Sequence, residues 1–318
     1  MTLQDRLCNR FHLKPAELLM MITALAILSL NVILVLLKGA RIDLPAYTGI
    51  LAIVLFTVPL GLFYRITGRS ERIASSLICS GTFIFFSACL SLFNYMLLPV
   101  STPLMDPLLA SFDAMVGFNW PDVMHWAAEH PNLSAVFKFA YNTTLPQFAL
   151  LVVILGLTGR ARDLHVMITS VTITATLTIC FWGVLPSMGP GTIYTLPPEV
   201  WNILGAVADD RYSAEIASLA QTGPGVISPK EIRGLIAFPS YHTVLAFTAM
   251  YAARNVPGIN IAFLALNLVM LPGIVIHGSH HLMDLFGGFA MFAFGTWIAT
   301  RAVTRDYERR GAPEFVAA

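Results

Sequence analysis

Residues 18–37 read LLMMITALAILSLNVILVLL, a run of twenty positions without a charged side chain. A helix needs about 20 mostly apolar residues to cross the hydrocarbon core of a bilayer. The basic residues Arg6, Arg10 and Lys14 precede this run, as they would in a secretory signal. The run is too long for a signal, however, and no small-residue cleavage site follows it. We therefore interpret it as a retained transmembrane helix.

Apolar stretches of this kind recur along the whole chain. Of the 318 residues, 56% are hydrophobic and 12% are charged, which is far from the balance of a water-soluble domain. We predict an all-α polytopic membrane protein with about eight transmembrane helices. The predicted spans are Ala16–Leu37, Leu44–Tyr64, Ile73–Leu98, Leu133–Leu157, Leu164–Leu185, Tyr241–Ala253, Ile259–Ile276 and Leu282–Ala302.

The spans divide the chain into three parts. Residues 1–72 are expected to form an N-terminal tail and two peripheral helices, residues 73–303 a six-helix core, and residues 304–318 a C-terminal tail. Two long segments interrupt the core. In residues 101–132, prolines break up apolar residues that recur at helical spacing, which predicts short helices lying on the membrane surface. Residues 187–238 are rich in Gly-Pro turns, which predicts an irregular segment that folds back over a site.

The positions of Lys and Arg predict the orientation, because short cytoplasmic loops are enriched in them. With the N-terminus inside, thirteen of the 19 basic residues fall in cytoplasmic segments and six fall outside. Both termini are therefore expected in the cytoplasm, and both long segments on the extracytoplasmic side. A bacterial inner membrane, or an endomembrane with the site facing its lumen, fits this pattern. No basic patch with interleaved aromatic residues indicates nucleic-acid binding.

Two clusters of ionisable residues lie where predicted spans begin, on the same side of the membrane. Residues 238–243 read FPSYHT and residues 277–284 read HGSHHLMD. Ionisable groups at membrane depth are costly and point to a functional site. His280 and Asp284 are four residues apart, so in a helix they share a face. A carboxylate bound to one imidazole nitrogen raises the basicity of the other, as a histidine nucleophile requires. His242 is expected to face His280 across a pocket and to give or take a proton.

Together the two clusters resemble signatures of the type 2 phosphatidic acid phosphatase superfamily. The second signature, Pro-Ser-x-His, matches residues 239–242, and the end of the third, His-x-x-x-Asp, matches residues 280–284. The resemblance covers roughly residues 73–303. It implies a six-helix core in which these signatures open the fourth and sixth helices.

The resemblance also implies a role for each matched residue. His280 attacks phosphorus and forms a phosphohistidine, Asp284 supports it, and His242 protonates the leaving oxygen. Ser240 hydrogen-bonds the phosphoryl group. The substrate is then a phosphate-bearing membrane lipid of the phospholipid or sphingolipid type, and no metal or organic cofactor is implied.

The chain departs from the family pattern where phosphate is bound. The usual third signature has a Ser-Arg pair beginning seven residues before its histidine, and Gly273 and Ile274 occupy those positions. The first signature carries a Lys and an Arg-Pro pair, whereas residues 185–190 contain no basic residue. The inositol phosphorylceramide synthase branch also lacks the Ser-Arg pair and has a His-rich third signature. The chain is most similar to that branch, which favours transfer to an alcohol or polyol acceptor over hydrolysis.

A transferring phosphoryl group still needs positive charge or several hydrogen-bond donors. The basic residues on the correct side include Arg233 and Lys230, just before the second signature, and Lys138 at the outer end of the fourth span. Tyr141 and Asn142 share a helical face with Lys138. Arg233 is the first candidate to replace the missing arginines.

Three other interpretations stay open at this point. One is a zinc site, since histidine and aspartate are proper ligands and the second cluster holds four of them: His277, His280, His281 and Asp284. In the phosphoryl interpretation, by contrast, His277 and His281 only support the site. A proton-coupled transporter would use the same residues as a proton relay, although the clusters lie at helix ends and no inverted repeat is visible. A relative that only binds lipid would account for the missing arginines.

Overall fold

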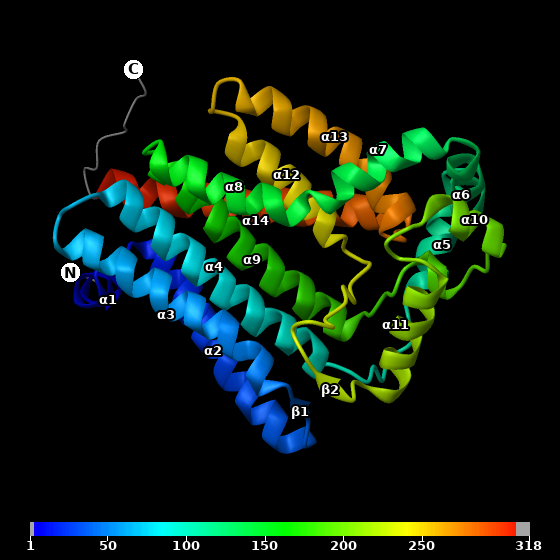
Figure 1. Ribbon diagram of the computed structural model, residues 1–318, viewed down its shortest axis with the longest axis horizontal. Coiled ribbons are helices and arrows are strands. Elements are labelled where there is room, and N and C mark those ends of the chain that lie inside the picture. The colour runs from blue at the N-terminus through cyan, green and yellow to red at the C-terminus, as the bar shows by residue number, and fades with distance from the viewer. Residues whose placement is uncertain (1–2, 310–318) are drawn as a thin grey trace.

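The protein is almost entirely helical (Figure 1). The computed structural model describes residues 3–309. Its helices are α1 (Leu3–Phe11), α2 (Pro15–Lys38), α3 (Leu44–Ile66), α4 (Glu71–Met96), α5 (Asp106–Met115), α6 (Trp120–Glu129), α7 (Pro131–Asn142), α8 (Thr144–Leu157), α9 (Ala161–Val184), α10 (Pro198–Leu204), α11 (Asp210–Thr222), α12 (Tyr241–Ala253), α13 (Ile259–His277) and α14 (Leu282–Arg309). A 3-10 turn, η1, spans Pro190–Thr192, and two short strands are β1 (Arg41–Ile42) and β2 (Val226–Ile227). The predicted all-α class is confirmed.

Most of the predicted spans are long apolar helices. Within residues 3–309, six helices are long and apolar enough to cross a membrane, namely α2, α3, α4, α9, α13 and α14. The pair α7 and α8 adds a seventh if it counts as one span. The protein is therefore a polytopic integral membrane protein, as its composition predicts.

Two of the predicted spans differ from a single membrane-crossing helix. The span at 133–157 is broken after Asn142, where α7 and α8 meet with a bend of 46°. The span Tyr241–Ala253 forms α12 with the predicted bounds and 13 residues. A helix of that length reaches only about 20 Å along the ~30 Å hydrocarbon core. Within residues 3–309 the number of full-length candidate spans is thus six or seven rather than eight. Apolar composition alone reveals neither the break between α7 and α8 nor that α12 is too short to cross the core.

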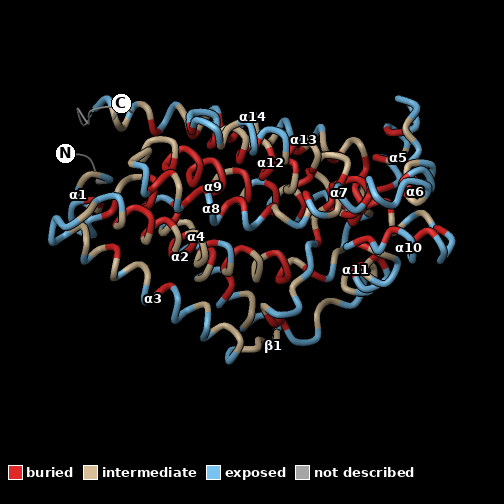
Figure 2. The backbone as a smooth tube through the Cα atoms, turned by 45° about the horizontal axis from the view of Figure 1, so that its top comes forward, coloured by how far each residue is buried: buried red, intermediate tan, exposed pale blue. Residues whose placement is uncertain are grey.

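The main hydrophobic core runs along the inside of the bundle (Figure 2). Buried side chains of α2, α4, α8, α9 and α12 build it, including Met20, Phe86 and Phe148. Helix α9 is central, since most of its residues are buried and α2, α4, α12 and α14 all pack against it. In α3 the buried residues are only Val54 and Gly61, so this helix lies on the outside against α4.

The two ends of the bundle differ. At one end, α1 and the last turn of α14 are joined by an ion pair of 2.8 Å between Arg309 and Asp5. At the opposite end, α5, α6, α10 and α11 gather into a group that we call the cap (Figure 1). The short helices predicted in 101–132 are confirmed as α5 and α6. The segment 187–238 was predicted to be irregular, and this is wrong in part because it contains α10 and α11.

The segment that leads into α12, residues 228–238, crosses the bundle as a strap. It follows β2, which pairs in parallel with β1 at the α2–α3 link. Two tyrosines hold the strap: the N–H of Arg233 donates to the hydroxyl of Tyr95, and the hydroxyl of Tyr212 donates to the carbonyl of Gly234, both at 2.6 Å. These contacts fix the strap between α4 and the cap, directly before the first histidine cluster.

Candidate active site

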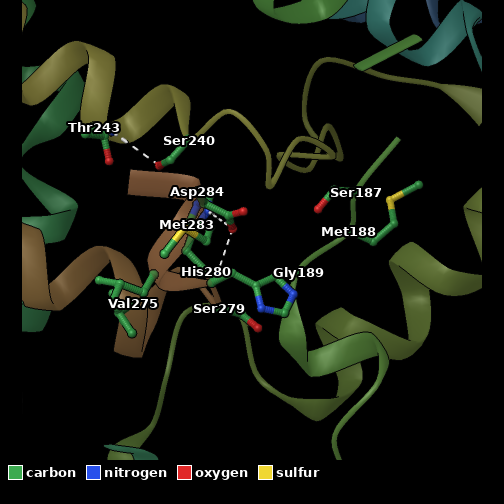
Figure 3. Close-up of polar contacts among 12 residues, drawn as sticks. Ser187, Met188, Gly189, Ser240, Thr243, Val275, Ser279, His280, Met283 and Asp284 are labelled. Carbon is green, nitrogen blue, oxygen red and sulfur yellow. Dashed lines mark hydrogen bonds and ion pairs between the residues drawn. The ribbon is translucent and has the colours of Figure 1, made fainter. Parts of the chain in front are cut away.

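The link between α13 and α14, residues 278–281, and the first turn of α14 carry the predicted histidine–aspartate pair. Nδ1 of His280 lies 3.0 Å from Oδ2 of Asp284 (Figure 3). The same oxygen accepts a hydrogen bond of 2.8 Å from the backbone N–H of His281, which is the reach-back contact of a capping box at the third helical position. The pairing is confirmed, but His280 lies just before the helix rather than within it. The start of α14 thus fixes the carboxylate, and the carboxylate fixes the ring of His280.

His242, near the start of α12, faces the same point. Its ring centroid is 6.1 Å from that of His280, with the rings at 69°, and it stacks on Tyr141 of α7 at 4.6 Å. The predicted juxtaposition of the two histidines is confirmed. Ser240 is fully buried and caps α12 by accepting a hydrogen bond of 3.4 Å from the N–H of Thr243 (Figure 3). In this structure its hydroxyl therefore sets the start of the helix that carries His242.

Two glycines allow the segments of the site to approach each other. Gly189 has φ +93°, and a Cβ there would lie 2.3 Å from the carbonyl oxygen of Ser279. At Gly288 of α14, a Cβ would lie 2.4 Å from the carbonyl oxygen of Ser240. A side chain at either position would push apart the elements that carry the histidines, so glycine is required by close packing at both.

His280 and His242 lie on the wall of a cavity of about 400 Å³ that polar and apolar residues line together, and that we call the polar cavity. Polar side chains from the cap, the link and the strap share this wall, among them Ser213, Ser279 and Arg233. The volume is within the ~300–1,000 Å³ typical of small-molecule sites. The predicted folding of segment 187–238 over a site is confirmed, since residues of α11 and the strap line this cavity.

A second cavity of about 360 Å³, the apolar groove, adjoins the first. Its walls come mainly from α4, α9 and α12 and include Phe83, Phe86, Leu90, Val171 and Leu245. The two cavities share strap residues 232–236, the first two residues of α8, and His242. His242 therefore lies where the polar cavity and the apolar groove meet.

The other predicted binding residues lie at different distances from the cavities. Arg233 lines both of them and is paired with Glu215 at 3.3 Å. Tyr141 lines the polar cavity. Lys138 instead donates to the backbone carbonyl that ends α10, and Lys230 is not among the residues that line either cavity. Of the three basic candidates, only Arg233 is among the residues that line the same cavity as the two histidines.

The positions of the missing Ser-Arg pair are occupied by tight packing. A Cβ at Gly273 would lie 2.5 Å from the carbonyl oxygen of Phe137 in α7, and Ile274 is fully buried in the core. Helices α13 and α7 therefore approach too closely for an arginine to extend from these positions. The Ser-Arg pair of the usual third signature therefore has no equivalent at these positions of α13.

The zinc interpretation does not fit the directions of the histidine rings. Nε2 of His277 lies 2.9 Å from the carbonyl oxygen of Ser134, and Nδ1 of His281 lies 3.3 Å from Asp113 of α5. Neither ring converges with that of His280. Over residues 3–309, these side chains do not form a group close enough to hold one ion.

Sequence analysis missed two buried carboxylates on α5. Asp106 accepts hydrogen bonds of 2.9 and 2.6 Å from the N–H groups of Met188 and Gly189, on a segment that faces the link (Figure 3). Asp113 accepts from the first two N–H groups of α14, at 3.0 and 2.9 Å. Asp106 and Asp113 are seven residues apart, which is two helical turns in a mostly apolar segment. This spacing was the sequence feature that could have indicated two inward-facing carboxylates. Their partners lie far along the chain, so no local pattern identifies them.

Fold and site together define a polytopic membrane protein with a histidine–aspartate pair and a facing histidine on the wall of a polar cavity. A sequence profile described as the PAP2 superfamily matches residues 107–298. The chain therefore belongs to the PAP2 superfamily, whose enzymes are phosphatases. No match was found among curated proteins or among solved structures. The predicted superfamily is confirmed, whereas nothing in the comparisons identifies the inositol phosphorylceramide synthase branch.

Proposed function

We propose that this protein is a membrane lipid phosphatase or phosphotransferase that works through a phosphohistidine at His280. The observation that carries the proposal is that His280, paired with Asp284, faces His242 across the polar cavity, and that His242 also lines the apolar groove. Membership of the PAP2 superfamily supports phosphoryl chemistry. The groove supports a lipid substrate, because its apolar walls suit a hydrocarbon chain while the polar cavity suits a phosphate headgroup.

The proposed reaction has two half-reactions. In the first, Nε2 of His280 attacks phosphorus, the bond from phosphorus to the lipid oxygen breaks, and His242 gives that oxygen a proton. Asp284 holds the proton on Nδ1 and so leaves the lone pair on Nε2. In the second, water or an alcohol attacks the phosphohistidine, His242 takes its proton, and the phosphorus–nitrogen bond breaks. Hydrolysis and transfer differ only in this second nucleophile.

Within this proposal we favour transfer to an alcohol or polyol by a small margin. The absence of basic residues at 185–190 and 273–274 sets the chain apart from the ordinary phosphatase signatures. The meeting of two cavities at His242 supports a reaction with two substrates, one entering through the groove and one through the polar cavity. A sphingolipid-type substrate is the corresponding proposal for the lipid.

The test uses purified protein with diacylglycerol phosphate and ceramide phosphate, each carrying radiolabelled phosphate. We expect acid-labile label on the protein and release of phosphate from at least one lipid. Addition of glycerol or inositol separates the two versions, because a transferase forms the labelled alcohol phosphate and a hydrolase only inorganic phosphate. If proteoliposomes move the intact lipid and label never leaves it, the transporter interpretation replaces ours.

The orientation of the site is proposed to be extracytoplasmic, from the distribution of basic residues. A cysteine that replaces Glu129 in the cap is expected to react with a membrane-impermeant thiol reagent in intact cells. A cysteine that replaces Arg305, at the opposite end of the bundle, is expected to react only after lysis. Cys180 is exposed and is replaced by Ser in both variants. Labelling of the Arg305 variant in intact cells would reverse the orientation and place the site inside.

Arg233 is expected to supply part of the missing positive charge. Arg233→Ala should raise KM by about ten- to a hundredfold, since a hydrogen bond to a charged group contributes ~1.5–3 kcal/mol. The KM of Arg233→Lys should lie between that of the wild-type protein and that of Arg233→Ala, because lysine keeps the charge but lacks the planar guanidinium. Lys230→Ala, on the same strap but outside both cavities, is the matched control in a steady-state assay. If Arg233→Ala and Lys230→Ala give the same KM, the charge has another source.

A further inference from the structure

The imidazole of His281, next to the proposed nucleophile, lies between two carboxylates of α5. Its Nε2 is 3.5 Å from Oδ1 of Asp106, and its Nδ1 is 3.3 Å from Oδ2 of Asp113. The ring is fully buried, as is Asp106, and Asp113 is 3% exposed. We call these three residues the brace.

Each carboxylate of the brace also holds a different piece of backbone. Asp106 binds residues 187–189 through the hydroxyl of Ser187 and the N–H groups of the next two residues, and this segment reaches the polar cavity at Met188. Asp113 binds the first N–H groups of α14, in the same turn that contains Asp284. One rigid helix thus connects a wall of the cavity with the start of the helix that orients His280.

A charged ring complements this geometry best. A neutral imidazole has one N–H donor and one acceptor, so it would turn a lone pair toward one of the two carboxylates. An imidazolium presents an N–H to each of them; here Nδ1 makes a hydrogen bond with Asp113, and Nε2 lies at ion-pair distance from Asp106. Burial lowers the pKa of His281, but its contact with Asp106 and the charges of Asp284 and Asp113 outweigh burial and raise it above the ordinary value. The neighbouring His280 opposes the effect of these carboxylates, because its charged form would repel a charged His281.

We propose that His281 is a positioning residue which, as an imidazolium between Asp106 and Asp113, locks α5 onto the start of α14 and so aligns His280 and Asp284 for attack. This inference rests on the proposed function. The charged ring does not touch the substrate, since His281 is not among the residues that line the polar cavity. Its effect is therefore expected in the chemical step rather than in binding.

The charge state is measured without substrate, by NMR of the protein labelled in its histidine rings. The signal that disappears in His281→Gln should report two protonated nitrogens at neutral pH and lose a proton only in alkaline solution. In Asp106→Asn, which keeps the side-chain volume, this transition should move down by about 1–3 pH units, the usual effect of losing a nearby opposite charge. A neutral ring at pH 7 in the wild-type protein would overturn the brace.

Kinetics then test its role. Asp106→Asn and His281→Gln should lower kcat by about 10²-fold, the scale of a small misplacement of reacting groups, and leave KM near the wild-type value. In Asp106→Asn the alkaline fall of kcat should begin at a lower pH, as in the NMR titration. His277→Gln is the control, because His277 is equally buried but bonds to Ser134. Normal kcat in both brace variants would overturn the positioning role, whereas a wild-type protein without turnover would overturn the proposed function instead.

Discussion

His280→Ala is expected to abolish both turnover and the covalent intermediate. Losing the covalent nucleophile of a serine protease lowers kcat on the order of 10⁶-fold, and we expect a loss of that order here. His281 cannot replace the lost ring, since its two nitrogens face Asp106 and Asp113. The measurement is the amount of acid-labile label retained by the protein, together with phosphate release.

The Asp284→Asn variant keeps the proposed nucleophile, His280, and tests how much the carboxylate that supports it contributes. Because Oδ2 alone contacts both the N–H of His281 and Nδ1 of His280, the amide oxygen can keep both contacts. The neutral amide, however, no longer stabilises the positive charge that develops on the ring of His280 during attack. Labelling should therefore be slowed and not lost. His277→Gln should label at the wild-type rate. An active His280→Ala protein would show that the nucleophile is another group.

The second large effect is expected at His242. His242→Asn should slow formation of the phosphohistidine by ~10²–10⁴-fold, which is the usual contribution of a positioned general acid or base. Its ring lies 6.1 Å from that of His280, and both rings line the polar cavity, so a phosphoryl group bound in that cavity can contact both. Single-turnover kinetics with the labelled lipid measure this step directly.

A substrate with a better leaving group distinguishes the two histidines. A nitrophenyl phosphate ester needs little proton donation, so it should restore much of the rate to His242→Asn and none to His280→Ala. The same ester with wild-type protein gives the reference rate. Equal rescue of both variants would mean that His242 does not act as the proton donor.

Much of the fold could be predicted because lipid imposes a simple rule on sequence. Long apolar helices are the economical way to satisfy backbone hydrogen bonds in a bilayer, and α12 lies where an apolar span was predicted, although an earlier start at Pro239 was expected from its short length. The helices of the cap followed weaker signals. Pro198 opens α10, and the side chain of Asp209 accepts from the N–H of Tyr212 at the start of α11; both are start signals that the many Gly-Pro turns concealed.

The site was predictable where its geometry is local and not where it is long-range. His280 and Asp284 are four residues apart, so the sequence predicted their contact, although the first turn of α14 and its cap bring them together rather than a shared helix face. The contact of His281 with Asp106 joins positions 175 residues apart in the chain, and only the packing of α5 against the link creates it. The same holds for Arg233, whose approach to the histidines depends on where Tyr95 and Tyr212 hold the strap.

Helix α4 ends before the part of the chain that matches the superfamily, residues 107–298, yet Phe83, Phe86 and Leu90 of this helix form a wall of the apolar groove. Part of the surface that would hold a hydrocarbon chain is therefore encoded outside the stretch that carries the histidines, while α9 and α12 supply the rest from within it. Evolution could change the lipid that is accepted by altering α4 while the residues proposed for chemistry stay the same. Relatives aligned only over their shared segment would then look alike in catalysis and still differ in the membrane lipids they consume.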